Sequence, residues 1–256
     1  MRRLYIIALF TMLICIGCQW HLRPSDDADE EQEVEIERFD RAERLYLSTG
    51  DFAALQQMKT VYPMQTRKLI EDVLKLGQVD EPDINTRFLL FFQDSTLQAL
   101  MYDVDTQFSD IEDISSDLNR SFKRMSKLLP PFEMPVVYTQ IGSLDQSIVV
   151  GDGQLGISLD KYLGSTHPVY LRYGYTEEQR SMMTRNYIVP DCVGFFLLSI
   201  YPPQEGHERE HFARIQYVVN RVMGRKIFKD KEVKKVEQYM LRHPSTKLHD
   251  LLTASV

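Results

Sequence analysis

The chain has 256 residues and carries 30 Lys and Arg against 37 Asp and Glu, which gives a formal net charge of −7. This acidic balance, with no basic stretch interleaved with aromatic residues, argues against nucleic-acid binding. The length is sufficient for one sizeable hydrophobic core even after a leader is removed.

The first 17 residues have the features of an export signal. Two arginines at positions 2 and 3 precede an apolar run over residues 4–16, which is too short to span a bilayer comfortably. The run ends in Cys15-Ile16-Gly17-Cys18, which resembles the bacterial lipobox, whose cysteine is acylated and becomes the mature N-terminus. We predict a signal peptide over residues 1–17 and palmitate-type acylation of Cys18. An ordinary secretory signal and an uncleaved anchor are the alternatives.

Residues 18–37 are predicted to form an acidic tether that connects the lipid anchor to the folded domain. Eight Asp and Glu lie between positions 26 and 37, so charge repulsion favours an extended, solvated segment. In lipoproteins of Bacteroidota-type bacteria, acidic residues near the lipidated cysteine can accompany surface export. Gln19, rather than Asp, follows Cys18 and argues against inner-membrane retention. We therefore expect an outer-membrane lipoprotein that faces the periplasm or the cell surface.

The cysteine content limits the chemistry of the mature chain. Cleavage would remove Cys15, and acylation would consume Cys18, so Cys192 would be the remaining free thiol. A disulfide within the mature chain is then excluded. Cys192 lies in an apolar stretch, which predicts a buried, inert thiol. Cleavage also removes two arginines, and the formal net charge falls to about −9.

Helix signals dominate residues 40–129. Asp51 is suited to cap a helix over residues 52–60, Pro63 begins one that ends at Gly77, and Asp94 is suited to cap the next. Residues 88–92 are apolar almost all round, which predicts deep burial. A further helix begins at Asp110 and ends before two prolines, with an apolar stripe of Ile111, Ile114, Leu118, Phe122 and Met125.

A small sheet is predicted between residues 135 and 164, where β-branched and aromatic residues cluster between Gly and Pro. Asp152-Gly153 separates two apolar runs and tolerates the positive φ angles of a tight type I′ hairpin. Leu155, Ile157 and Leu159 alternate with small residues, which is typical of a strand with one buried face.

Helices return after the sheet. Residues 176–179, Thr-Glu-Glu-Gln, fit a capping box at the start of a helix. Pro190 precedes a very apolar helix over residues 192–200. The next two helices are predicted over residues 205–223 and 229–242, and a short one follows Ser245.

The chain resembles the GldB family, the gliding-motility lipoproteins of Bacteroidota, over most of residues 36–200. The matching stretches are the lipobox, residues 36–40, Tyr62-Pro63, Leu76-Gly77, residues 187–191 and above all the run Leu-Gly-Ile-Ser-Leu-Asp-Lys-Tyr-Leu-Gly over residues 155–164. The resemblance implies a cell-envelope lipoprotein with no established catalytic activity. The layout is also distantly similar to that of zincin-like domains, in which a sheet precedes an active-site helix. Residues 191–200 would form that helix here, and they contain no histidine.

One motif could be catalytic. His207-Glu208-Arg209-Glu210-His211 fits His-Glu-x-x-His, which on a helix would point two imidazoles at one Zn²⁺, with Glu208 as the base. Glu232 or Glu237 could supply a third ligand. The neighbouring charges and prolines favour instead a solvated helix start, with Phe212, Ile215, Val219 and Val222 forming the buried stripe.

Asp160 and Asp191 are the other candidates. Asp160 follows the predicted strand, and we interpret it as a cap of the turn over residues 161–163. Asp191 follows Pro190, and we interpret it as a cap of the apolar helix that begins there. Neither is interpreted as a catalytic acid.

The sequence therefore predicts one α+β domain over residues 38–256, predominantly helical around a small β-sheet. The leading function is a non-enzymatic envelope lipoprotein, without cofactor, that scaffolds or couples other envelope proteins. The alternative is a zinc metallopeptidase that uses His207, His211 and Glu208.

Overall fold

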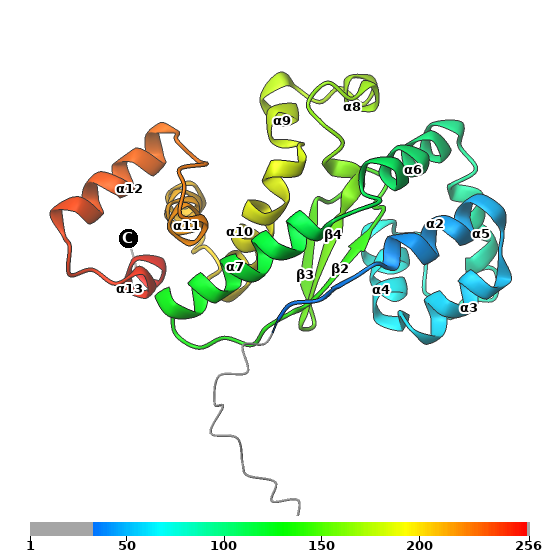
Figure 1. Cartoon of the computed structure of the whole chain (residues 1–256), viewed down its shortest axis with the longest axis horizontal. Coiled ribbons are helices and arrows are strands. Elements are labelled where there is room, and N and C mark those ends of the chain that lie inside the picture. The colour runs from blue at the N-terminus through cyan, green and yellow to red at the C-terminus, as the bar shows by residue number, and fades with distance from the viewer. Residues whose placement is uncertain (1–32, 255–256) are drawn as a thin grey trace, which may run out of the picture. The chain divides into compact units, whose positions relative to one another are not determined.

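The computed structural model describes residues 33–254. Within this range the chain is a predominantly helical α+β domain around a small mixed sheet, as predicted, and the buried hydrophobic residues form one core between Val34 and Leu252 (Figure 1). The predicted signal peptide, Cys18 and residues 19–32 lie outside the described residues. No helix in the described range is long and apolar enough to cross a membrane.

The sheet has four strands in the order β1-β2-β4-β3. β2 pairs in parallel with both β1 and β4, and β3 pairs antiparallel with β4. The strands are β1 (Ile36–Glu37), β2 (Val136–Gln140), β3 (Ile148–Gly151) and β4 (Gln154–Ser158).

The predicted hairpin is confirmed. Gly151 pairs with Gln154 across the turn, and the two residues between them, Asp152 and Gly153, have φ angles of 52° and 71°. Two positive φ angles are what a type I′ turn requires, because this turn follows the right-handed twist of the strands.

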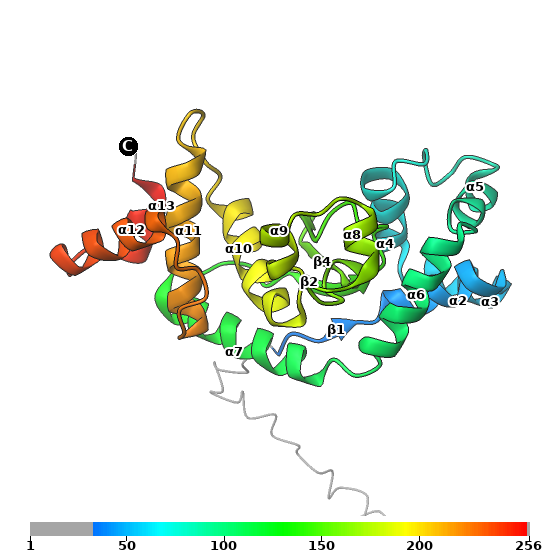
Figure 2. The ribbon, with the colours of Figure 1, turned by 90° about the horizontal axis from the view of Figure 1, so that it is seen from above.

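The prediction of one buried face for β4 is wrong, because Leu155, Gly156, Ile157 and Ser158 are all buried. Helices lie on both sides of the sheet, with α10 (Ile188–Ile200) on one side and α4 (Pro63–Arg67) on the other (Figures 1 and 2). In a strand that is covered on both faces, the alternation of large and small residues reflects side-chain size and does not show which face meets solvent.

The helices before the sheet begin largely where the caps predict. The Asp51 carboxylate accepts a hydrogen bond from Ala54 N, and the Asp94 carboxylate accepts bonds from Thr96 N and Leu97 N. These elements are α2 (Phe39–Thr49), α3 (Phe52–Thr60), α4, a π-helical segment (Lys68–Val73), α5 (Ile84–Phe91), α6 (Ser95–Gln107) and α7 (Glu112–Leu128).

After the sheet, Thr176 and Gln179 form the predicted capping box. Asn220 links the end of α11 to the following connection, accepting hydrogen bonds from Ile227 N and Phe228 N. The elements are two 3-10 turns (Leu159–Lys161 and Arg185–Tyr187), α8 (Pro168–Arg172), α9 (Glu177–Met182), α10, α11 (Glu208–Met223), α12 (Lys231–Arg242) and α13 (Leu248–Thr253).

Two expectations need correction. The tether was predicted to extend to residue 37, but Val34 and Ile36 are buried in the core, and β1 pairs with β2. The sequence analysis missed this segment because it contains only two apolar residues, each flanked by Glu.

The prediction that residues 88–92 are deeply buried is also wrong in part. Phe88 and Phe92 are fully buried, whereas Leu90 is 63% exposed, because a helix at a domain surface buries only one face.

Candidate functional site

The His-Glu-x-x-His stretch lies at the beginning of α11. His207 is the exposed residue that precedes the first helical turn, and the connection before it turns at Gly206, whose φ is 82°. The Glu208 carboxylate turns back and accepts a hydrogen bond from Gly206 N at 3.0 Å. Bonds from backbone N–H groups lower the pKa of Glu208. The charged Glu208 therefore stabilises the helix start, as an acidic side chain at this end of a helix does.

His211 differs from the prediction, because it is buried and not solvated. Its Nε2 lies 2.7 Å from the carbonyl oxygen of Tyr201, the residue that ends α10. Positions 211, 215, 218 and 222 share one helical face, and this face contacts the core. Phe212, predicted to be in the buried stripe, is 44% exposed. The buried stripe of α11 therefore begins with the imidazole of His211, whereas we expected it to begin with the ring of Phe212.

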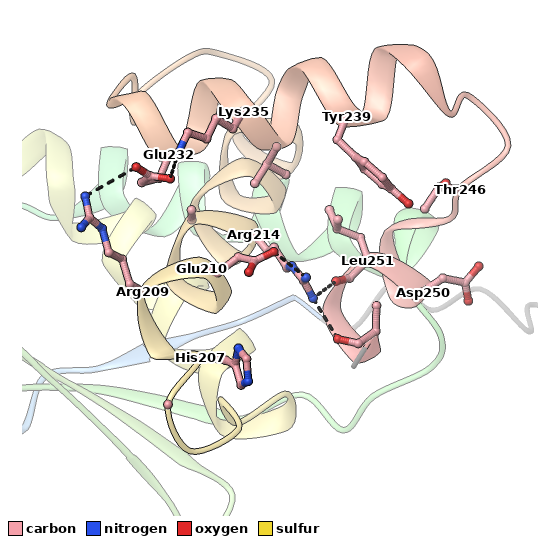
Figure 3. Close-up of a pocket in the computed structure, with 14 residues that line it drawn as sticks. His207, Arg209, Glu210, Arg214, Glu232, Lys235, Tyr239, Thr246, Asp250 and Leu251 are labelled. Carbon is pink, nitrogen blue, oxygen red and sulfur yellow. Dashed lines mark hydrogen bonds and ion pairs between the residues drawn. The ribbon is translucent and has the colours of Figure 1, made fainter. Parts of the chain in front are cut away.

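A cavity of about 870 Å³ lies between α11, α12 and α13 (Figure 3). Ala213, Val236 and Leu251 contribute apolar surface, and charged side chains surround them. Figure 3 shows Glu232 beside Lys235 and Arg209, well separated from His207.

The charged side chains of this cavity contact one another and the backbone. Glu232 accepts from Lys235 at 2.8 Å and pairs with Arg209 at 3.5 Å, and the bond from Lys235 lowers the pKa of Glu232. Arg214, which is largely buried, pairs with Glu210 at 2.8 Å and donates to the carbonyl oxygens of Leu251 and Ala254. Arg214 therefore caps the carboxyl end of α13 and fixes it against α11.

The structure does not gather the proposed zinc ligands. His207 and His211 both line a smaller cavity of about 210 Å³, but Glu232 does not, and Glu237 pairs with Lys226 at 2.5 Å. Within residues 33–254 no group of three or more His, Cys, Asp and Glu side chains is arranged to hold a metal ion. The zinc alternative gains no support from this arrangement.

Asp160 has a different role from the predicted cap. It lies in the 3-10 turn after β4 and is fully buried, and its two carboxylate oxygens accept from Gly142 N at 2.8 Å and Leu144 N at 2.6 Å. The two carboxylate oxygens of Asp160 therefore hold the loop that follows β2 in place. Ser143 and Leu144 in this loop have φ angles of 54° and 65°, a left-handed conformation that is costly for residues other than glycine.

Glu43 is a second buried carboxyl group that the sequence analysis missed. Its Oε2 accepts from Ile141 N at 2.9 Å, and its Oε1 has no hydrogen-bond partner in the described part of the chain. Desolvation, and secondarily the charges of Asp160 and Asp40, raise the pKa of Glu43 well above its usual value. The signal was present in the sequence, because Glu43 falls within the apolar stripe of its helix, formed by Phe39, Ala42, Tyr46 and Leu47.

The carboxyl ends of the parallel strands β2 and β4 meet at the same edge of the sheet, where open α/β sheets commonly bind ligands. In this protein Glu43 and Asp160 fix the loop over residues 141–144 at that edge. Both oxygens of Asp160 and one oxygen of Glu43 bind backbone N–H groups, so backbone occupies most of the acceptors at this edge, and Glu43 Oε1 is the exception.

Asp191 lies in the first turn of α10 but is not its cap, which is Tyr187. Its carboxylate accepts from the hydroxyl of Tyr162 at 2.8 Å. Desolvation raises the pKa of Asp191 to about 7, although the bond from Tyr162 opposes the shift. The next residue, Cys192, is a fully buried free thiol, as predicted, and burial raises its pKa.

Together these features define a mainly helical α+β protein whose buried carboxylates hold backbone segments in place. Residues 22–217 match the family described as gliding motility protein GldB. The chain belongs to this family of gliding-motility-associated lipoproteins, which the sequence resemblance had indicated. No curated protein and no solved structure is significantly similar to it.

Proposed function

We propose that this protein is a lipoprotein of the outer membrane, anchored by acyl chains on Cys18 and facing the periplasm or the cell surface. Family membership supports the lipoprotein assignment. The sequence Cys15-Ile16-Gly17-Cys18 supplies the acylation site, and Gln19 favours transfer out of the inner membrane. Several acyl chains would make the attachment durable, because each buried methylene contributes about 0.8 kcal/mol.

The folded domain, in this proposal, acts by binding other envelope proteins and not by catalysis. The observation that carries this part is the environment of His211. Its ring nitrogen is engaged by the Tyr201 carbonyl, and this contact joins α10 to α11. His211 of the zinc-like motif thus has a structural role, and the neighbouring Arg214 likewise binds the carboxyl end of α13.

The anchor is tested by metabolic labelling with a palmitate analogue, followed by membrane fractionation. The wild-type chain is expected to incorporate label and to sediment with membranes, and Cys18→Ala is expected to lose the label. The matched control is Cys15→Ala, which removes the other cysteine of the leader and should still be labelled. Label that persists in Cys18→Ala would refute the proposed anchor.

The non-enzymatic role is tested by metal analysis of the purified protein. We expect no stoichiometric zinc and no effect of His207→Ala/His211→Ala on metal content. His243→Ala serves as a control for the loss of a histidine elsewhere. Stoichiometric zinc that disappears only in the double variant would overturn this part of the proposal and favour the zinc alternative.

A further inference from the structure

The C-terminal part of the chain has a charge opposite to that of the rest. Residues 218–256 contain nine Lys and Arg against four Asp and Glu, a net charge of +5. Because the whole chain carries −7, the preceding 217 residues carry −12. The family match ends at residue 217, so this basic segment follows the matched region directly.

The fold gathers part of this charge around one groove. The groove has a volume of about 510 Å³ and lies between the end of α11, the connection over residues 224–230 and α12. Arg221, Arg225, Lys229 and Lys234 line it together with the apolar side chains of Phe228 and Val233. We call these six residues the basic groove.

The cations of the basic groove are available for a ligand. Arg221, Arg225, Lys229 and Lys234 are exposed, and none of them forms an ion pair with another residue in the range 33–254. Lys226 and Glu237 also line the cavity, but their charges are paired with each other at 2.5 Å. Unpaired cations around an apolar floor favour an anionic ligand.

Hydrogen bonds hold the backbone of the groove in shape. Asn220 accepts from Ile227 N and Phe228 N at 2.8 and 3.0 Å and donates to the carbonyl oxygen of Phe228 at 2.7 Å. From α7, Arg124 donates to the carbonyl oxygen of Met223 at 2.7 Å. The connection is thus fixed before any ligand binds, which reduces the entropy lost on binding.

The helix α12 extends the same surface with an apolar contact. Leu241, which is 76% exposed, lies two helical turns after Lys234, so both side chains project from one side of the helix. Basic side chains next to an exposed aliphatic residue are typical of surfaces that bind the head-group region of a membrane.

We propose that the basic groove binds anionic lipid head groups at the membrane that holds the protein. This inference rests on the proposed lipid anchor. Residues 19–32 span at most about 50 Å when extended, so the anchor would keep the groove close to the head groups. The same negative surface would repel the acidic remainder of the chain, and the domain would be oriented with α12 toward the lipid.

The test uses the polypeptide over residues 19–256, which lacks the leader and Cys18 and retains the whole described core. Co-sedimentation is measured with vesicles of phosphatidylcholine alone and with added phosphatidylglycerol. We expect binding only to the anionic vesicles, weakened by salt. Arg225→Glu/Lys229→Glu should lower the affinity at least about tenfold. Lys59→Glu/Lys75→Glu, the same change at two exposed lysines before the sheet, should bind like the wild type.

Three results would overturn the inference: no binding to anionic vesicles, equal losses in both double variants, or tighter binding to a single-stranded DNA oligonucleotide than to the vesicles. Circular dichroism establishes that each variant is folded. Because the tested polypeptide lacks Cys18, its failure would leave the anchor proposal standing. Conversely, vesicle binding by this polypeptide together with label that persists in Cys18→Ala would refute the anchor alone.

Discussion

The sheet edge and the C-terminal helices use charge in opposite ways. At the sheet edge, Glu43 and Asp160 are buried and bind backbone N–H groups of the loop after β2. In α11 and α12, Arg209 and Lys235 pair with Glu232 near the surface, and the cations of the basic groove have no anionic partner in the described range.

The difference separates residues that hold the fold from residues that, in our proposal, bind a ligand. A buried carboxylate that satisfies backbone donors is costly to remove, because the donors cannot find water instead. An exposed ion pair contributes little to stability and can be exchanged for a ligand. The comparison therefore predicts large effects on stability at the sheet edge and small ones in the C-terminal helices.

The largest loss of stability is expected for Asp160→Ala. The substitution leaves the N–H groups of Gly142 and Leu144 buried without acceptors, and we expect a loss of about 2–5 kcal/mol in the free energy of unfolding. Chemical denaturation measures it. The control is Asp145→Ala, an exposed aspartate in the same loop, with an expected change within about 0.5 kcal/mol. Equal effects of the two substitutions would contradict the anchoring role of Asp160.

Gly156→Ala is expected to destabilise the fold by about 1–3 kcal/mol. A Cβ atom at this position would lie 2.5 Å from Cζ of Tyr138, whose ring is fully buried and cannot move aside freely. Gly194→Ala is the control, since its Cβ would meet Val219 at an ordinary 3.7 Å and alanine favours the helix. Thermal denaturation of the two variants compares their stabilities. A Gly156→Ala protein as stable as the wild type would show that the sheet can shift to accommodate the added methyl group.

Asp191 is expected to make the stability of the fold depend on pH. Its folded-state pKa is raised to about 7, so the folded protein binds a proton more tightly than the unfolded chain does. The protonated Asp191 therefore stabilises the folded state. This contribution is fully present below the ordinary pKa of Asp and is lost as the pH rises to about 7. In Asp191→Asn the slope of stability against pH between about 4 and 7 should be smaller by up to about 1.4 kcal/mol per pH unit, one proton. Denaturant titrations at several pH values measure it, and an unchanged slope would exclude Asp191 as the titrating group.

The smallest effect is expected for Glu232→Gln. Its partners, Arg209 and Lys235, are exposed and solvent screens both pairs, so we expect little or no loss of stability. Urea denaturation of this variant beside Asp160→Ala gives the contrast directly. A loss at Glu232 as large as that of Asp160→Ala would show that the C-terminal helices depend on their surface charges, contrary to this expectation.

Local chemistry made much of the fold predictable. Asp51, Asp94 and Thr176 cap helices because the cap and its N–H partners lie within three residues of each other. Asp152-Gly153 predicted the hairpin for the same reason. The site was less predictable. The interpretation of His211 failed because its partner, the Tyr201 carbonyl, belongs to the preceding helix end, and Asp160 was assigned to its own turn although it binds residues 142 and 144.

The sequence by itself determined most of the helices, the turn of the hairpin, the buried thiol at Cys192 and the family, but not strand β1. Each of these depends on neighbouring residues or on a contiguous pattern. Only the tertiary structure decided that Glu43 lies beside the loop after β2, and that Arg221 and Lys234 line one groove on an acidic protein. Contacts between residues far apart in the chain depend on how the helices pack, and packing follows the shape of the whole core rather than any local pattern.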